Sequence, residues 1–301
     1  MSQQFIIGLD VGGTKTHLLA ERAPGTGRTE RRGPGANLQR VGPDAVVETL
    51  EGLIREALPG PGCRVAVCAG VAGAGRADEQ AALQERLRTA LADAAERVRV
   101  AVTHDATIAL EAAFGAEGGA IVIAGTGSVV LGRGRGGTTR RAGGWGHRLG
   151  DVGSGHAVGR AALRAVAAAY DGGPPTGLRD RVQERYGIDS RADLFRWTYR
   201  EEAPLAEVAP LVGAAAAAGD AVAEEILASQ TAALARQAAW VVGAAEEPAP
   251  RVALLGGMLR SEPYARALRQ ALGACLPQAS VSRLQEAPVV GALRRAHRLG
   301  A

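Results

Sequence analysis

Two segments 112 residues apart share one pattern, and this repeat constrains the fold more than any other feature of the sequence. The first, residues 5–20, reads FIIGLDVGGTKTHLLA: an apolar run, a Gly-Gly-Thr turn and a second apolar run. The second, residues 119–131, reads GAIVIAGTGSVVL and places Gly125-Thr126 on Gly13-Thr14. Each segment predicts a buried strand, a glycine turn and a returning strand. Because strands and helices alternate after each copy, the chain is predicted to be a duplicated α/β domain.

The two turns have the residue types that bind phosphate. Glycines let the backbone approach an anion closely, and turn N–H groups with a Thr hydroxyl can point at phosphate oxygens. Asp10 ends the first strand, where a carboxylate can hold a hydrated divalent cation, and Val122 takes its place in the second copy. If the two domains face each other, both turns border one interdomain cleft. For the first segment alone, an ordinary hairpin turn with a stray Asp is the alternative.

Composition narrows the class of protein. The 301 residues, 47% hydrophobic and 22% charged, are typical of a soluble globular protein of one large or two modest domains. The formal charge of +4 is small and the arginines are interspersed with acids, so nucleic-acid binding is not expected. The acid-free basic stretch 133–141 is interpreted as a solvated loop.

Neither a disulfide framework, a zinc site nor membrane insertion is expected. The three cysteines, Cys63, Cys68 and Cys275, have no regular spacing. We find no signal peptide and no apolar run long enough to cross a membrane, so a cytoplasmic location is expected.

Hydrophobic periodicity predicts alternating strands and helices after the first hairpin. A polar, glycine-rich segment covers residues 28–42. A mostly helical insert is expected over residues 178–247. Strands are predicted over 64–71, 98–103 and 251–255, and helices over 46–58, 78–97, 106–114, 154–170, 261–272 and 289–299.

Asp105 is the candidate catalytic residue. It follows an apolar strand and precedes a helix, which places it at the carboxyl end of a strand. In phosphoryl transfer to a hydroxyl group, a carboxylate in this position can orient the hydroxyl and accept its proton. The alternative is that Asp105 only caps the helix, a common role for Asp.

The segment GGWGHRLGDVGSG, residues 143–155, is the candidate substrate loop. Trp145 offers an apolar platform, the glycines let a ligand approach the backbone, and Asp151 can accept hydrogen bonds from hydroxyl groups. A glycine-rich surface loop around a buried structural Trp is the alternative.

Five motifs in this order, DVGGTKT, THDA, AGTGS, GGWGHRLGDVGSG and LLGGML, resemble the sugar-kinase/Hsp70/actin superfamily. More closely, they resemble the group of N-acetylglucosamine kinases and BadF/BadG/BcrA/BcrD ATPases, over nearly the whole chain. The resemblance implies duplicated ribonuclease H-like (actin-like ATPase) α/β domains around an interdomain cleft. The expected domains are residues 1–114 joined by the C-terminal helix 289–301, and residues 115–288 with the helical insert.

The resemblance also implies an activity and its residues. We expect ATP-dependent phosphorylation of an amino sugar, N-acetylglucosamine first (to the 6-phosphate) and glucosamine second, with ATP, Mg²⁺ and a homodimer. Asp105 would be the catalytic base and Asp10 would hold Mg²⁺ through water. The sugar would contact Asn37, Asp105, Gly144, Trp145, Gly146 and Asp151, and the nucleotide would contact Gly12, Gly13, Thr14, Lys15, Thr126, Gly127, Ala216, Gly256 and Gly257.

One departure from the family and three alternative functions remain open. The family usually has Gly-Asp-Glu-Gly-Ser where this chain has Val152 in place of the Glu, a change that alters sugar choice or weakens activity. One alternative is an ATPase that activates a dehydratase or reductase through an iron–sulfur cluster, but the cysteines do not match that arrangement. A sugar-responsive transcription regulator would need a DNA-binding module before the first strand. The last alternative is a non-catalytic protein that binds ATP or sugar.

Overall fold

The computed structural model describes residues 3–23, 25–134, 136–200, 203–244 and 250–301. The chain divides into two compact units, residues 1–117 with 284–301 and residues 118–283. The sequence predicted domains of residues 1–114 with 289–301 and of residues 115–288, so both domain boundaries lie a few residues from the predicted positions. Among the described residues, no helix is both long and apolar enough to span a membrane.

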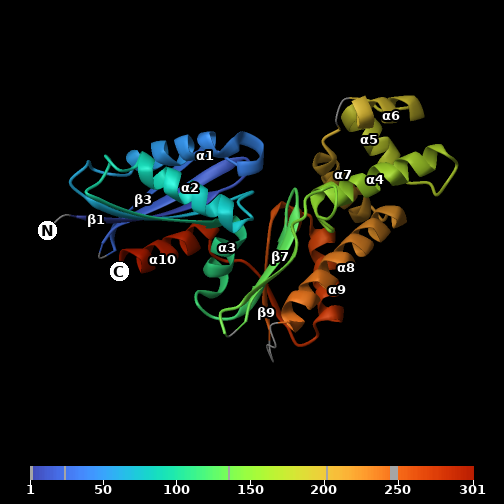
Figure 1. Ribbon diagram of the computed structural model, residues 1–301. Helices are drawn as coiled ribbons and strands as arrows, with labels where there is room; N and C mark the ends of the chain where they lie inside the picture. Colours follow the sequence, from blue (N-terminus) through green and yellow to red (C-terminus); the bar gives the residue numbers. More distant parts are fainter. Residues whose placement is uncertain (1–2, 24, 135, 201–202, 245–249) are drawn as a thin grey trace. The chain divides into compact units, whose positions relative to one another are not determined.

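The first unit is a five-stranded sheet with helices on both faces (Figure 1). Alternating side chains divide its core. Ile7, Leu9 and Val11 pack in one cluster with α1 and α2, and Ile6 packs in another with α3 and α10. Its elements are β1 (Gln4–Val11), β2 (Lys15–Arg22), β3 (Thr26–Pro34), α1 (Leu38–Arg55), β4 (Arg64–Val71), α2 (Ala77–Ala90), β5 (Arg97–His104), α3 (Asp105–Phe114) and α10 (Pro288–Gly300).

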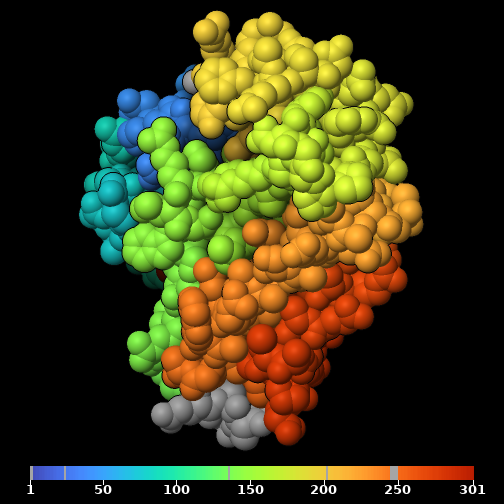
Figure 2. All heavy atoms as spheres, turned by 90° about the vertical axis from the view of Figure 1, so that its right-hand side faces the viewer, coloured from blue at the N-terminus to red at the C-terminus, as the bar shows by residue number. Residues whose placement is uncertain are grey.

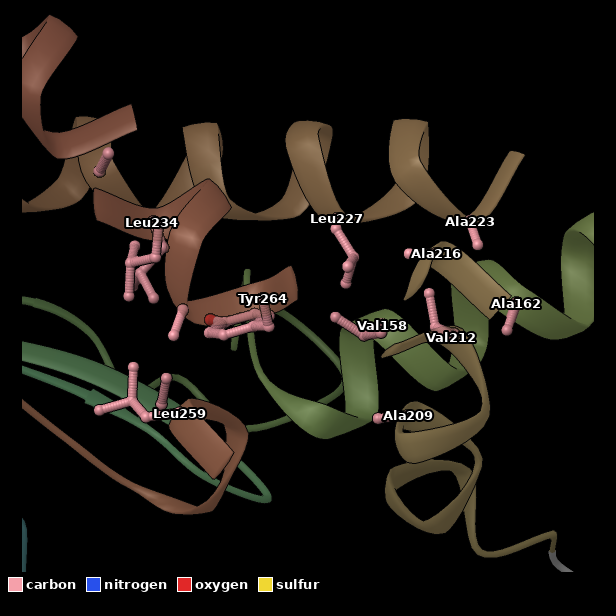
Figure 3. Packing of buried hydrophobic residues seen from close by; sticks show 14 of the residues in the cluster. Val158, Ala162, Ala209, Val212, Ala216, Ala223, Leu227, Leu234, Leu259 and Tyr264 are labelled. Carbon is pink, nitrogen blue, oxygen red and sulfur yellow. The ribbon is translucent and has the colours of Figure 1, made fainter. Parts of the chain in front are cut away.

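The second unit repeats the sheet and adds helices. Its largest fully buried side chain, Tyr264, points into a cluster with Leu234, Leu227 and Val158 (Figure 3). The elements are β6 (Gly119–Ala124), β7 (Ser128–Arg133), β8 (Thr139–Gly143), α4 (Gly155–Tyr170), α5 (Leu178–Tyr186), α6 (Arg191–Arg200), α7 (Leu205–Ala217), α8 (Ala221–Gly243), β9 (Arg251–Leu255), a 3₁₀ helix (Gly257–Arg260), α9 (Glu262–Cys275) and β10 (Ser280–Arg283).

The two sheets have the same topology, which confirms the predicted duplication. The strand order is β3-β2-β1-β4-β5 in the first sheet and β8-β7-β6-β9-β10 in the second. In each, the first three strands form an antiparallel meander, and the last two pair in parallel beside the first. The α/β class is therefore confirmed as well.

Several predicted boundaries were wrong for local reasons. The predicted helix 78–97 ends at Ala90 as α2, and turns follow it. β3 was not predicted because its polar side chains are nearly all exposed, and it pairs with β2 along one edge only. The stretch 133–141 is not one loop, because Thr139–Arg141 belong to β8. The helical insert is confirmed as α5 to α8, although residues 245–247 lie outside the described part of the chain.

Helix α10 approaches the first sheet through glycines. A Cβ on Gly291 would lie 2.0 Å from the Ile108 carbonyl oxygen and 2.6 Å from the Ala112 nitrogen, both on α3. A Cβ on Gly8 of β1 would lie 2.4 Å from the Leu293 nitrogen. The C-terminal helix therefore packs with its backbone against α3 and β1, as predicted for the first domain.

We expect Gly291→Ala to lower the free energy of unfolding by roughly 1–3 kcal/mol or more, because backbone atoms cannot yield to the added methyl group. The matched control is Gly52→Ala in the exposed part of α1, where a Cβ has no neighbour within 4 Å. This control should stabilise the protein by about 0.5–1 kcal/mol. Urea unfolding measures both, and equal effects would contradict the close packing of α10.

Candidate functional site

The carboxyl edge of the first sheet brings two acids near each other. β1, β4 and β5 pair in parallel, with Asp10 opposite Gly70 and Val71 opposite His104. Asp10 lies near the end of β1, and Asp105 directly follows β5. Only β4 separates the two strands, so the acids share one edge about 10 Å wide, two strand spacings.

The charges at this edge change the protonation of Asp10. Burial, and then the negative charge of Asp105, raise the Asp10 pKa from 3.8 to about 6, while the charge of Lys15 lowers it. The carboxyl group of Asp10 is therefore costly to ionise in the folded protein. A cation at this edge would relieve both the burial and the repulsion.

Asp105 is the first residue of α3, and its neighbour His104 is the N-cap. The Ala106 N–H donates to His104 Nδ1 (3.1 Å) and to Asp105 Oδ1 (2.8 Å). His104 Nδ1 also lies 2.9 Å from Asp105 Oδ1. This nitrogen can thus donate to the carboxylate or accept from Ala106, according to where its proton lies. The side chains of His104 and Asp105 thus both accept from an N–H at the start of α3, so the helix-cap role of Asp105 stays open beside the catalytic one.

The first glycine turn is fixed by backbone contacts. The Gly12 N–H donates to the Lys15 carbonyl (3.0 Å), and the Gly12 carbonyl accepts from Ala36 (3.0 Å). A Cβ on Gly35 would lie 2.4 Å from the Thr14 nitrogen. Gly35 therefore holds the segment before α1 directly against the turn. Gly13 and Thr14 remain exposed and available to a ligand.

Asn37 lies beside this turn but has a structural partner. It is the N-cap of α1, and its Oδ1 accepts from the Gln39 N–H (3.0 Å). The same oxygen would be 2.8 Å from a Cβ on Gly73. The Asn37 amide nitrogen has no hydrogen-bond partner among the described residues, so it is the group that can serve a ligand.

The second glycine turn has an equivalent support in its own unit. The Gly125 N–H donates to the Gly127 carbonyl (2.9 Å). The Gly125 and Thr126 carbonyls accept from Gly155 (2.8 Å) and His156 (3.2 Å) at the start of α4. Thr126 is exposed. The turn is thereby joined to the end of the candidate substrate loop.

Asp151 lies beside this second turn, not at the exposed end of the loop. Its side chain is only 7% exposed, and a Cβ on Gly127 would lie 3.0 Å from its Oδ2. Asp151 has φ 59°, the only non-glycine residue in the left-handed region among the described residues. None of the described residues donates a hydrogen bond to the carboxylate of Asp151. Neither carboxylate oxygen is among the fully buried unpartnered polar atoms of the described residues, so the carboxylate can accept hydrogen bonds from a polar ligand.

The end of the loop is held by the second core. The Gly153 carbonyl accepts from the Tyr264 hydroxyl (2.6 Å), and the Gly153 N–H donates to Gln230 Oε1 (3.1 Å). Ser128 Oγ donates to the Val152 carbonyl (2.8 Å). The sequence did not reveal these supports, because Gln230 and Tyr264 are remote helix residues without a motif.

The exposed part of the loop presents Trp145. Gly143, Gly144 and Gly146 all have left-handed φ angles of 69–80°, so the chain curls tightly around this residue. Trp145 is 75% exposed. The alternative of a buried structural Trp is therefore wrong, and its ring is free to contact a ligand.

The remaining predicted nucleotide residues differ in accessibility. Gly256 has φ 117°, and a Cβ there would lie 2.1 Å from the Ala124 carbonyl oxygen, directly before the second turn. Gly257 has open space around it, so this segment presents bare backbone. Ala216 is different because its side chain is 6% exposed and packs in the core cluster.

Comparison with known proteins identifies a family and relatives that match most of the chain. The model of a family described as the BadF/BadG/BcrA/BcrD ATPase family matches residues 7–294. The N-acetylmuramic acid/N-acetylglucosamine kinase of Clostridium acetobutylicum is 33% identical over 233 residues, 74% of each chain. The N-acetyl-D-glucosamine kinase of Dictyostelium discoideum is 31% identical over 246 residues, 75% of this chain and 76% of the relative.

Solved structures agree with these matches. A candidate N-acetylglucosamine kinase from Chromobacterium violaceum has a TM-score of 0.75 and 28% identity, and the match covers 97% of this chain and 98% of the other. A ROK family glucokinase from Streptomyces griseus, solved with glucose and AMPPNP, has a TM-score of 0.55 at 17% identity over 98% of both chains. The second match shows a shared fold alone.

We expect Asp10→Asn to stabilise the protein at pH 7 and not at pH 4. An acid whose pKa is raised by folding binds its proton more tightly in the native state, so stability falls as pH rises from about 4 to about 6. The variant removes this loss, which is worth up to about 3 kcal/mol for a shift of about two units. Urea unfolding of both proteins between pH 4 and pH 7.5 measures the difference.

The control for this experiment has the opposite sign. A hydrogen bond from Arg55 lowers the pKa of the exposed Asp93, so Asp93→Asn should cost more stability at pH 7 than at pH 3. A stability difference between Asp10→Asn and the unchanged protein that does not vary with pH would refute the raised pKa of Asp10.

Proposed function

The chain belongs to the BadF/BadG/BcrA/BcrD ATPase family, and we propose that it is an ATP-dependent kinase that phosphorylates N-acetylglucosamine to the 6-phosphate. The observation that carries this proposal is the pair of curated relatives above 30% identity. Both are N-acetylglucosamine kinases, and each match covers about three quarters of this chain. The local geometry of each unit supports the same chemistry.

Asp105 is the proposed base. In the proposed step, the sugar hydroxyl gives its proton to the Asp105 carboxylate as its oxygen bonds to the γ-phosphorus of ATP. The bond from that phosphorus to the bridging oxygen breaks, and ADP leaves. His104 Nδ1, 2.9 Å from Asp105 Oδ1, would hold the carboxylate in position.

The glycine turns are the proposed phosphate-binding elements. In the first unit, the exposed Gly13 and Thr14 offer N–H groups and a hydroxyl, and Lys15 adds a positive charge. In the second unit, Thr126 and Gly127 offer the equivalent groups. The bare backbone at Gly256 and Gly257 suits the flat face of an adenine ring, and Ala216 would act only through its small size.

Mg²⁺ suits the acids of the first sheet edge. Among the described residues no group of three or more His, Cys, Asp or Glu could hold a metal, so a cation there would depend on phosphate oxygens and water as well. Mg²⁺ accepts such a site because it keeps most of its water shell. Asp10 would hold it, and it would neutralise charge on the phosphates.

Trp145, Gly144, Gly146, Asp151 and Asn37 are the proposed sugar contacts. The Trp145 ring provides an apolar face, while the Asp151 carboxylate accepts from a hydroxyl group. A second acceptor, N-acetylmuramic acid, is favoured by the name of the Clostridium relative. Arg148 and His147 are exposed in the same loop and could face the additional carboxylate of that sugar.

The proposed setting of this enzyme is the cytoplasm, where ATP is available and the free thiols Cys63, Cys68 and Cys275 would stay reduced. The homodimer implied by the family resemblance belongs to the same proposal. The mass of the protein in solution measures that assembly.

A panel of acceptors tests the reaction itself. ADP release should be fastest with N-acetylglucosamine, compared with glucosamine, N-acetylmannosamine, N-acetylmuramic acid and glucose. The rate should fall to background when EDTA replaces Mg²⁺, because the phosphate charge is then not neutralised. Absence of ADP release with every sugar, by folded protein at saturating ATP, would eliminate the kinase function.

Asp105→Asn separates catalysis from helix capping. Turnover should fall on the order of a hundredfold or more, the usual contribution of a positioned base. Melting temperature and ATP binding should change little, because Asn is nearly isosteric and the turns are untouched. A matched control is Asp78→Asn, an exposed acid in the first turn of α2, which should leave turnover unchanged. Near-normal turnover of Asp105→Asn would remove this residue from the mechanism.

A further inference from the structure

An open cavity of about 470 Å³ lies between α4 and the helical insert of the second unit, and none of the proposed kinase residues lines it. One wall is a single face of α4 from Arg160 to Ala167, with Asp171 directly after the helix, and the other wall is α6 with Leu205 at the start of α7. The two helices are in contact, and Figure 2 shows the lime to yellow part of the chain, to which they belong, at the surface. The volume lies within the range of small-molecule sites, roughly 300–1,000 Å³.

An aromatic pair lines this cavity. The rings of Phe195 and Tyr199 lie 4.8 Å apart at 39°, and the residues are 58% and 73% exposed. In contrast, the neighbouring pair Tyr186 and Trp197 is partly buried against the core. Aromatics form only 3% of the chain, so two exposed rings on one pocket wall are unusual here. Their faces suit an apolar or planar group.

The charge of the lining is positive. Arg191 is paired with Asp171 at 2.8 Å. Arg160 and Arg164 lie one turn apart on α4, and neither has an acidic partner among the described residues. Guanidinium groups bind carboxylate and phosphate through paired hydrogen bonds. Two such groups beside an apolar wall select an anion with an apolar body.

We propose that this cavity binds a small organic anion, a carboxylate or phosphate ester that carries an apolar or aromatic group. Its charged end lies between Arg160 and Arg164, and its body lies against Phe195 and Tyr199. This function is additional to the proposed sugar phosphorylation and does not require it.

Arg160 connects the cavity to the substrate loop. Its Nη1 donates to the His147 carbonyl at 3.2 Å. The His147 ring stacks on His156 at 4.8 Å, and the His156 N–H donates to the Thr126 carbonyl in the second glycine turn. An anion that binds the Arg160 guanidinium weakens the hydrogen bond from Arg160 to the His147 carbonyl. Occupancy of the cavity therefore loosens the loop around Trp145.

Calorimetric titration with 1-naphthoate tests the site, with the neutral 1-naphthamide as the matched ligand. ADP is present throughout so that nucleotide-binding groups are occupied. The naphthoate should bind at least about tenfold more tightly than the amide, since charged hydrogen bonds are worth roughly 1.5–3 kcal/mol. Arg164→Gln should weaken naphthoate binding about tenfold or more, and Tyr199→Ala about threefold to tenfold.

The control variants remove the same types of side chain, an exposed aromatic ring and an exposed arginine, at positions outside the cavity. Trp240→Ala removes an exposed aromatic ring from α8, and Arg179→Gln removes an exposed cation from α5; both should bind naphthoate normally. Equal affinity for naphthoate and naphthamide, or normal binding by Arg164→Gln, overturns the proposed site.

Hydrogen exchange tests the connection to the loop. Saturating naphthoate should speed amide exchange in residues 144–150, and Arg160→Gln should show the faster exchange without the ligand. Unchanged exchange in the bound protein overturns the connection. None of these measurements uses sugar phosphorylation, so their outcome can be interpreted even if the proposed kinase activity is absent.

Discussion

The parallel register of β1, β4 and β5 is the constraint on which the chemistry of the first unit depends. It fixes Asp10 opposite Gly70 and sets the end of β5 level with the end of β4. Gly70 leaves the row between the acids without a side chain, and Ile108 of α3 fills that space, 2.4 Å from where a Cβ would lie. The fold thus brings Asp10 and Asp105 together and raises the pKa of one of them. Ionised Asp10 destabilises the folded protein, and a cation bound at this edge would offset that cost.

The second unit has the same topology but no buried acid at the matching position. Val122, the counterpart of Asp10, is fully buried in the core cluster. The duplicated turn therefore keeps its N–H groups and loses the acid. In its place, the carboxylate of Asp151 approaches the turn from the substrate loop, held by a left-handed backbone and by Tyr264 through Gly153. The two units thus supply different polar groups beside equivalent turns.

The repeat in the sequence was sufficient to predict the duplicated sheet, because buried strands and glycine turns leave a strong local pattern. β3 escaped prediction because an exposed edge strand needs no alternation of apolar residues. Asp10 and Asp105 could be selected as strand-end acids. Their electrostatic interaction could not, since it depends on the register of three strands.

Contacts remote in sequence were also beyond prediction. The sequence indicated Asp151 as a hydrogen-bond acceptor but not that it lies largely buried against Gly127. Its position follows from a left-handed backbone and from a partner of Gly153 on α9, and neither leaves a local pattern. The same limit applies to the cavity between α4 and α6. Its arginines look like ordinary solvated side chains until the helices are brought together.

The position of Val152 bears on whether the chain is catalytically competent. In the sequence this residue suggested a lost sugar contact. In the structure its side chain packs against the core of the second unit, and its carbonyl accepts from Ser128. The hydrogen bond from Ser128 goes to the backbone and does not depend on the side chain, so the segment that presents Asp151 keeps this support while Val152 replaces the carboxylate of the family with apolar packing.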